Sequence, residues 1–296
     1  MTDRIQMETD TVFVEVVPRL GGSITAFDAK DGKKREPIFR RWEGKDENPR
    51  ALGSSPMVPW FNRISGGGIN FGGKFYPIEP NDPREPVPLH GDGWFSAWNV
   101  VERTPNRVVL KLRSKTIPPF DYEATQVLSL KDSTFDMELR LKHLGPSPFP
   151  YGLGQHPWFV RTPGARLQAK ATGMWLEQPP AFPPKTEPAP IPPKWDFNNP
   201  NELPEDFIDN GYAGWDGHAR IEWRDRGLTV DVESDPSTRY YHVYSLDKDC
   251  PIFCFEPVTH PNNAYAKPGT PEQNGLRVLA SGAETSMLAR FRVSKT

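Results

Sequence analysis

The sequence predicts an all-β fold, a large sandwich of antiparallel sheets, and three observations lead to this prediction. The 296 residues include 34 prolines, about twice the usual share of roughly 5%. Each internal proline removes a helical hydrogen bond and clashes with the preceding turn, so long helices have little room. Several segments alternate apolar and polar residues, whereas no window of helical length shows a period of 3.6. Many short strands separated by turn signals favour a sandwich or barrel.

Three segments carry the alternation most clearly. They cover residues 135–142, 228–233 and 287–293, each with apolar residues at every second position. One face of each predicted strand is therefore buried and the other meets water. Further strand-like runs cover residues 12–17, 107–112, 126–130, 219–223, 240–246 and 252–256.

A proline-rich interruption covers residues 178–195. Such a segment is compatible with a domain linker, a ligand for a proline-binding module, or an extended loop. The strand-like segments on its two sides are similar in character, and Phe182, Ile191 and Trp195 offer apolar anchors. These features favour a loop lying over one domain, so we predict a single domain over residues 1–296.

The charge pattern argues against several classes of partner. The 36 Lys and Arg residues nearly balance the 38 Asp and Glu residues. Without a block of like charge, we expect neither nucleic acid nor a membrane surface as a partner. No run of about 18 apolar residues predicts a transmembrane helix, and residues 1–10 lack the apolar run of a secretory signal. We expect a soluble, cytoplasmic monomer or homodimer.

The two cysteines, Cys250 and Cys254, lie in one strand-like segment. At about 3.3 Å per residue their Cα atoms would be roughly 13 Å apart, too far for a disulfide. We interpret both as small buried core residues in a reducing compartment. A zinc site would need further ligands at matching spacings, so we expect no bound metal.

Two of the six histidines have sequence surroundings that suggest chemistry. His90 lies in Leu-His-Gly-Asp-Gly-Trp, where glycines let the backbone approach other groups. His156 lies in Gly-Gln-His-Pro-Trp-Phe, and a histidine held there could act as a general acid near neutral pH. The remaining four are His143, His218 and His242, interpreted as solvated or structurally hydrogen-bonded, and His260, whose position is ambiguous.

Three further residues could take part in a site. Glu256 ends an apolar strand-like run, where partial burial would raise its pKa and make it a better base; a structural pairing with an arginine is the alternative. Arg63 follows two aromatics and could bind hydroxyl groups with its fixed fork of donors. Asp209 precedes Asn-Gly in turn-rich sequence, which could present a carboxylate or simply be a turn. Several tryptophans lie near these segments, namely Trp60, Trp94, Trp98, Trp158 and Trp215.

Taken in order, these segments resemble the aldose 1-epimerase (galactose mutarotase) family. The similarity runs from about Asn62 to the C-terminal strand. The matching elements are Asn62-Arg63-Ile64, Phe71-Gly72-Gly73-Lys74-Phe75-Tyr76, His90-Gly91, Gly154-Gln155-His156-Pro157-Trp158-Phe159, Asp209-Asn210-Gly211-Tyr212 and Glu256-Pro257.

The resemblance implies a single supersandwich of antiparallel sheets with a cleft on its concave face. It also implies that Glu256 takes the proton of the anomeric hydroxyl while His156 gives a proton to the ring oxygen. Arg63, His90 and Asp209 would hold the sugar. The implied partner is a small free aldose, and no metal or organic cofactor is required, because a base and an acid suffice for ring opening.

Other functions fit parts of the same pattern. A glycoside hydrolase or lyase could use Asp209 and Glu256 as a carboxylate pair. A sugar-binding module without catalysis would keep Arg63 and the aromatics but would need no histidine opposite a glutamate. A sugar-phosphate epimerase is a further alternative, although the sequence shows no concentrated basic cluster for a phosphate.

Overall fold

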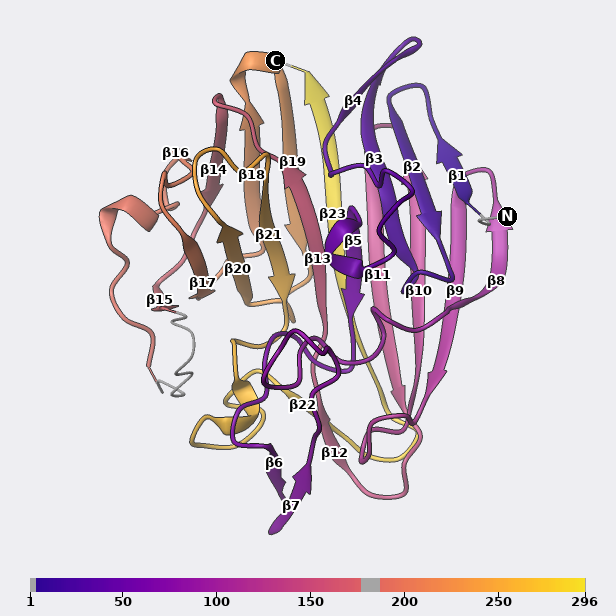
Figure 1. Ribbon diagram of the computed structural model, residues 1–296, viewed down its shortest axis with the longest axis vertical. Helices are drawn as coiled ribbons and strands as arrows, with labels where there is room; N and C mark the ends of the chain where they lie inside the picture. The colour runs from indigo at the N-terminus through magenta and orange to yellow at the C-terminus, as the bar shows by residue number, and fades with distance from the viewer. Residues whose placement is uncertain (1–3, 177–186, 296) are drawn as a thin grey trace.

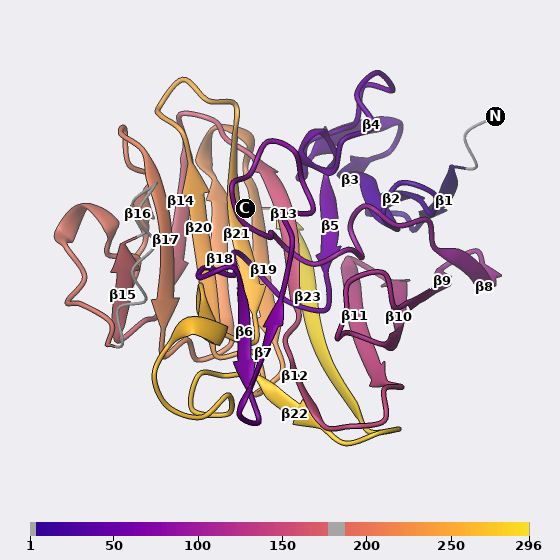
Figure 2. The same cartoon turned by 60° about the horizontal axis from the view of Figure 1, so that its bottom comes forward.

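The fold is built from two antiparallel sheets that pack face to face (Figures 1 and 2). The computed structural model describes residues 4–176 and 187–295. Within these residues one sheet has ten strands and the other has nine, and two short hairpin-like ribbons lie beside them. None of the helices in the described part of the chain is long and apolar enough to cross a membrane.

The ten-stranded sheet lies toward the viewer in Figure 1 and carries the residues discussed below. Its strand order is β1 (Ile5–Glu8), β2 (Val12–Val17), β3 (Ser23–Asp31), β5 (Ser54–Met57), β13 (Gly154–Val160), β21 (Ile252–Val258), β20 (Tyr240–Ser245), β17 (Ile208–Ala213) and β15 (Gly173–Leu176), with β4 (Lys34–Pro37) paired to β3.

The nine-stranded sheet lies behind it. Its order is β16 (Asn201–Glu202), β14 (Ala165–Ala169), β18 (His218–Trp223), β19 (Leu228–Ser234), β23 (Glu284–Lys295), β11 (Thr134–His143), β10 (Tyr122–Lys131), β9 (Arg107–Ser114) and β8 (Asn99–Thr104).

The smaller elements connect these layers. The two ribbons are β6 (Gly68–Phe71) with β7 (Lys74–Pro77), and β12 (Phe149–Tyr151) with β22 (Arg277–Leu279). In the described residues the helical elements are single 3₁₀ turns: η1 (Pro49–Ala51), η2 (Pro193–Trp195), η3 (Arg224–Arg226) and η4 (Ala264–Ala266).

The main hydrophobic core lies between the two sheets and draws on both. In β11 the four apolar residues of the alternating set are fully buried, whereas their polar neighbours reach the surface. Each such side chain contributes roughly 1.5–3 kcal/mol when it is removed from water. The period of two therefore holds β11 in register, because a shift of one residue would expose the whole apolar set.

All nine strand-like runs predicted from the sequence are confirmed as strands. Residues 12–17 coincide with β2, and the other eight runs fall within β9, β10, β11, β18, β19, β20, β21 and β23, apart from residue 246, which follows β20. The all-β class is likewise confirmed. The two cysteines are free, but only Cys254 is buried; Cys250 is half-buried where the chain enters β21.

The expected turn at Asp209 is wrong: Asp209, Asn210 and Gly211 lie in the middle of β17. This strand pairs with β15 on one side and β20 on the other, so ladder hydrogen bonds offset the poor strand propensity of Asn-Gly. A Cβ at Gly211 would lie 3.2 Å from the side-chain oxygen of Asn262, a tight contact that the glycine avoids.

The proline-rich segment is described in part. Residues 178–186, with Phe182, lie outside the described residues. Beyond them Ala189 exchanges two backbone hydrogen bonds with Met174 of β15. Ile191 and Trp195 pack against the main core, and the Trp195 carbonyl accepts a hydrogen bond from the Tyr212 hydroxyl. The described part of this segment therefore lies along the edge of the ten-stranded sheet, as a loop would.

Candidate active site

Four neighbouring strands bring polar side chains together on the face of the ten-stranded sheet that points away from the core. In β21, Phe253 and Phe255 are core residues, so Cys254 and Glu256 point to the opposite face. In the neighbouring strand β20, His242 is the register partner of Glu256. The strand alternation that builds the core thus also aligns the site.

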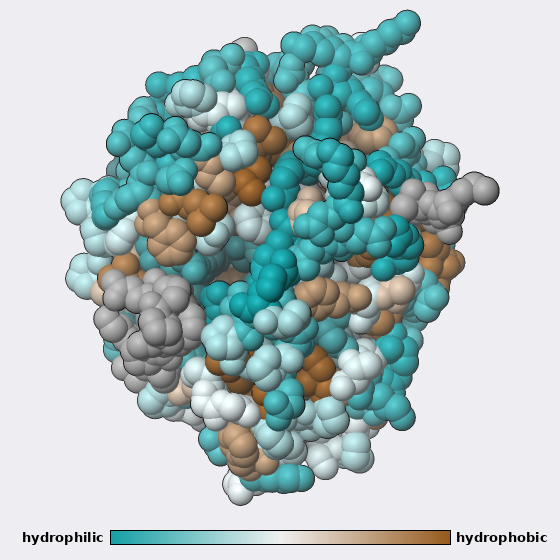
Figure 3. All heavy atoms as spheres, viewed as in Figure 1, coloured by the Kyte–Doolittle hydropathy of each residue, from teal (hydrophilic) through white to brown (hydrophobic). Residues whose placement is uncertain are grey.

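One pocket of about 150 Å³ forms over these strands. All five residues selected from the sequence line it, although they come from five separate segments of the chain. The face that contains it is largely hydrophilic and is hollowed over β20 and β21 (Figure 3). The lining residues are Arg50, Asn62, Arg63, Glu85, Leu89, His90, Trp94, His156, Trp158, Asp209, His242, Tyr244 and Glu256.

Larger hollows exist, but they lack this chemistry. One of about 590 Å³ lies beside Trp42 and Pro251, and one of about 620 Å³ lies between β6 and the loop that contains η4. Neither is lined by a histidine. The smaller pocket is therefore distinguished by its acid and base groups. Its volume does not distinguish it.

His156 and Glu256 form the centre of this convergence. The Nε2 atom of His156 lies 3.6 Å from Oε1 of Glu256, and both side chains are buried. Burial lowers the pKa of His156 to about 3, helped by the positive charge that His242 can carry. Burial raises the pKa of Glu256 to about 8; nearby His242 opposes this rise and Asp209 adds to it.

These shifts alter the chemistry expected from the sequence. With an ordinary pKa, His156 would be partly protonated near neutral pH, but in the buried pocket it is neutral. Glu256 is protonated there instead. Between the two pKa values the pair holds one proton in total, and that proton resides on Glu256. The proton can therefore pass from one residue to the other without changing the net charge of the pair.

His90 is held by backbone geometry. Its φ of 55° is left-handed, and so is the φ of 57° at Asn62. The backbone N–H of Asn62 donates to Nδ1 of His90 at 3.0 Å, which leaves the proton of the neutral ring on Nε2. Burial, with the charges of His156 and Arg63, keeps the pKa of His90 well below its usual value. Gly91 is required next to it, since a Cβ there would lie 2.1 Å from the Val58 carbonyl oxygen.

Asp209 is paired with His242, a residue that the sequence did not suggest for the site. Nε2 of His242 lies 2.6 Å from Oδ1 of Asp209, and the Asn262 side-chain amide contacts Nδ1 of His242 at 3.3 Å. Burial raises the pKa of Asp209, but the hydrogen bond and charge of His242 outweigh it, so the pKa is lowered. The alternation of β20, with Tyr241 and Val243 in the core, was the available signal for His242.

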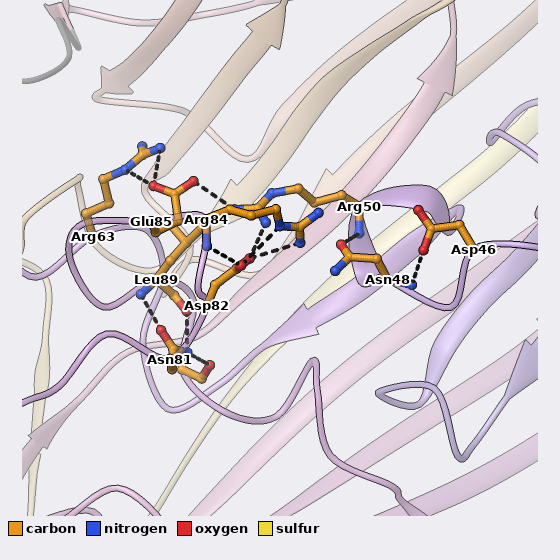
Figure 4. A network of polar contacts seen from close by, with 10 residues as sticks. Asp46, Asn48, Arg50, Arg63, Asn81, Asp82, Arg84, Glu85 and Leu89 are labelled. Carbon is orange, nitrogen blue, oxygen red and sulfur yellow. Dashed lines mark hydrogen bonds and ion pairs between the residues drawn. The ribbon is translucent and has the colours of Figure 1, made fainter.

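Arg63 belongs to an ion-pair network along one wall of the pocket (Figure 4). Its guanidinium donates to Oε2 of Glu85 at 3.2 Å, and Arg50 donates to Oε1 of the same carboxylate at 2.8 Å. Arg50 and Arg84 both pair with Asp82. Although burial opposes it, the hydrogen bonds from Arg84 and Arg50 lower the pKa of Asp82 to about 2.

This network corrects the expectation that the chain lacks a basic cluster. Arg50, Arg63 and Arg84 do gather beside the pocket, but they come from segments too far apart in the sequence to be seen as a cluster. Asp82 and Glu85 lie among them, so each arginine already has a carboxylate partner.

The tryptophans divide between the pocket and the core. Trp94 and Trp158 line the pocket, and the Trp158 ring stacks on His156 with centroids 4.9 Å apart. Trp60, Trp98 and Trp215 belong to the main core. The aromatic clustering seen in the sequence thus has two separate causes, and only two of the five named tryptophans reach the pocket.

Comparisons with known proteins identify relatives by sequence and by fold. The chain is 32% identical over 244 residues to the uncharacterized protein YphB of Escherichia coli K12, which covers 80% of this chain and 82% of that protein. Its fold matches the solved structure of a candidate aldose 1-epimerase from Escherichia coli K12 with a TM-score of 0.89, at 28% identity over 99% of both chains.

More distant solved structures share the fold. A galactose mutarotase-like protein from Clostridium acetobutylicum matches with a TM-score of 0.86, at 17% identity over 99% of this chain and 95% of that one. The family described as aldose 1-epimerase matches residues 3–292, nearly the whole sequence. The chain therefore belongs to the aldose 1-epimerase family.

Proposed function

We propose that this protein is an aldose 1-epimerase, which interconverts the α and β anomers of a free aldose by opening and reclosing the sugar ring. The observation that carries the proposal is the buried pair of His156 and Glu256, 3.6 Å apart in a pocket of about 150 Å³. Family membership supports it. A module that only binds sugar would have no need of such a pair.

Ring opening requires two proton transfers. The Glu256 carboxylate removes the proton of the anomeric hydroxyl, and the protonated His156 gives a proton to the ring oxygen. The bond between C1 and the ring oxygen breaks, its electrons pass to that oxygen, and an aldehyde forms at C1. After rotation about the C1–C2 bond, the reverse transfers close the ring with the other configuration.

The protonation state that burial favours fits the second half of this cycle. Ring opening leaves Glu256 protonated and His156 neutral, and this is the state that burial favours. In this state the pair can close the ring of an open-chain sugar. To open a ring, the proton first moves from Glu256 to His156, and a sugar hydroxyl between them can carry it.

Three further residues hold the substrate in this scheme. His90 presents Nε2–H as a donor, because its Nδ1 accepts the Asn62 N–H. Arg63 offers guanidinium donors, and Asp209 offers a carboxylate that His242 holds in place. The donors suit sugar oxygens, and the carboxylate suits a sugar hydroxyl proton.

The test is the rate of anomer interconversion. Fresh α-D-glucose and α-D-galactose, followed by polarimetry, should reach equilibrium faster with the protein than without it. Spontaneous rates across a broad panel of free aldoses would overturn the proposal. Sugar binding without acceleration would indicate a sugar-binding module. Release of reducing sugar from glycosides would indicate a hydrolase. Acceleration of phosphorylated aldoses alone would indicate a sugar-phosphate epimerase.

A further inference from the structure

The acid–base scheme makes no use of the cysteine that precedes Glu256 by two residues. Cys254 is fully buried, precedes Glu256 by two residues on β21, and therefore points to the same face of the sheet. Its register partner in β13 is Trp158, two residues from His156. One ligand atom from each of His156, Cys254 and Glu256 lies within 4.8 Å of the other two.

This cluster also has polar atoms without partners. Among the described residues, Oε2 of Glu256 and Nδ1 of His156 are buried and make no hydrogen bond. Glu256 is 2% exposed and His156 is 8% exposed. A buried carboxylate oxygen without a partner is costly, so Oε2 of Glu256 is available to a cation in addition to Oε1, which faces His156.

We propose that His156, Cys254 and Glu256 form a binding site for Zn²⁺, and that the bound ion blocks anomer interconversion. The blocking effect rests on the proposed function, because the ion would occupy both the acid and the base. The binding of the ion itself does not rest on the proposed function. The chemical class is a thiophilic divalent cation, since a thiolate ligand favours Zn²⁺ over Mg²⁺ or Ca²⁺.

The geometry of the cluster is close to that of a tetrahedral zinc site. With Zn–N and Zn–O bonds of about 2.1 Å, the N···O edge of the tetrahedron is about 3.4 Å, and the observed separation of His156 Nε2 and Glu256 Oε1 is 3.6 Å. With a Zn–S bond of about 2.3 Å, the edges to sulfur are about 3.6 Å. Because no ligand atom is more than 4.8 Å from another, a rotamer adjustment of Cys254 closes the remaining gap. Three protein ligands leave a fourth position for water or a sugar hydroxyl.

The charges also balance. One Zn²⁺ with a thiolate, a carboxylate and a neutral imidazole has no net charge, which suits a buried site. The ion takes the place of the protons on the thiol and the carboxyl group, and both protons go to solvent. Binding should therefore weaken as the pH falls.

The direct test uses Co²⁺ as a spectroscopic substitute for Zn²⁺ on the full chain after treatment with a chelator. We expect one equivalent of Co²⁺ to give a thiolate-to-cobalt charge-transfer band, which Zn²⁺ then displaces. Cys254→Ser should abolish the band, whereas the matched control Cys250→Ser should retain it. Absence of the band in wild type, or its survival in Cys254→Ser, would overturn the proposal.

A second variant keeps the test valid if Cys254→Ser folds poorly. Glu256→Gln removes a different ligand, and Co²⁺ affinity should fall by at least about tenfold, since even outer contacts of a metal site are worth 10–100-fold. Unchanged affinity would count against the site.

In the activity assay, Zn²⁺ should inhibit wild type and Cys250→Ser reversibly, with recovery on adding a chelator. If the protein binds Co²⁺ through Cys254 but accelerates no sugar, the metal site stands and the epimerase proposal falls; the opposite result removes only the metal site.

Discussion

His156 and Glu256 lie on adjacent antiparallel strands with Nε2 and Oε1 3.6 Å apart, and burial shifts their pKa values in opposite directions. Both shifts disfavour the charged forms, so the pair holds its single proton without a net charge. The cost of burying an ion pair is thereby avoided until a substrate enters. The pair thus has two states of the same net charge, one with the proton on Glu256 and one with the proton on His156. The first three predictions follow from this arrangement.

The first prediction concerns the two side chains themselves. Glu256→Gln and His156→Ala should each lower kcat for anomer interconversion by roughly 10²–10⁴-fold, the usual contribution of general acid–base catalysis. The circular dichroism spectrum should remain that of a β protein, because both side chains point away from the core between the sheets. Activity near that of wild type in either variant would refute the assigned role.

The second prediction is the pH profile of kcat/KM. The pair holds one proton between the pKa of His156, about 3, and that of Glu256, about 8. Above about pH 8 that proton is lost, and below about pH 3 a second one is added, so activity should fall on both sides of a broad plateau. Stopped-flow polarimetry from pH 4 to 10 can reveal the alkaline limb. A profile that rises between pH 8 and 10 would contradict the shared-proton scheme.

The third prediction tests the pKa of Glu256 through protein stability, without an activity assay. In the folded protein its pKa is raised from 4.5 to about 8, so its contribution to stability is complete below pH 4.5 and declines as the pH rises to 8. Glu256→Gln lacks this decline. In urea titrations, the free energy of unfolding of Glu256→Gln minus that of wild type should therefore increase by several kcal/mol as the pH rises from 4.5 to 8.

A matched control for this titration is Glu102→Gln. Glu102 is exposed on β8 of the other sheet and pairs with Arg107 at 3.0 Å. Exchanging a surface carboxylate of this kind has little effect on stability, so its difference from wild type should stay nearly flat over the same range. An equally flat difference for Glu256→Gln would show that Glu256 titrates normally in the folded protein.

The sequence predicted the clearly alternating strands and several apolar runs such as β2, but it missed β13 and β17. β11 alternates cleanly because one of its faces meets water, so its burial pattern is visible in the residues. Strands β13 and β17 are buried on both faces: one face packs against the core and the other faces the pocket. Most residues of β13 and all residues of β17 are therefore buried. Their residues therefore show no alternation, and Asn210-Gly211 even suggests a turn.

The site was predictable to the extent that single motifs marked its residues. His156 and Glu256 were chosen from their local sequence, and the fold places both in one pocket. Glu85 and Arg50 carried no such motif, because an ion-pair network depends on segments that only the fold brings together. The pKa shift of His156 was equally hidden, since it arises from desolvation by the surrounding sheet and loops.

The fourth prediction concerns substrate charge and Glu85. This carboxylate bridges Arg50 and Arg63 at the pocket wall, so it neutralises positive charge that would otherwise attract an anionic substrate (Figure 4). Glu85→Gln leaves both arginines with one negative partner fewer, so an aldose 6-phosphate should gain in kcat/KM relative to the free aldose. We expect a gain of about tenfold at low ionic strength, shrinking as salt screens the charges. Parallel kinetics with Glu102→Gln, far away on the other sheet, should show no change in this ratio. A ratio in Glu85→Gln equal to that of wild type would mean that Glu85 does not exclude anionic sugars.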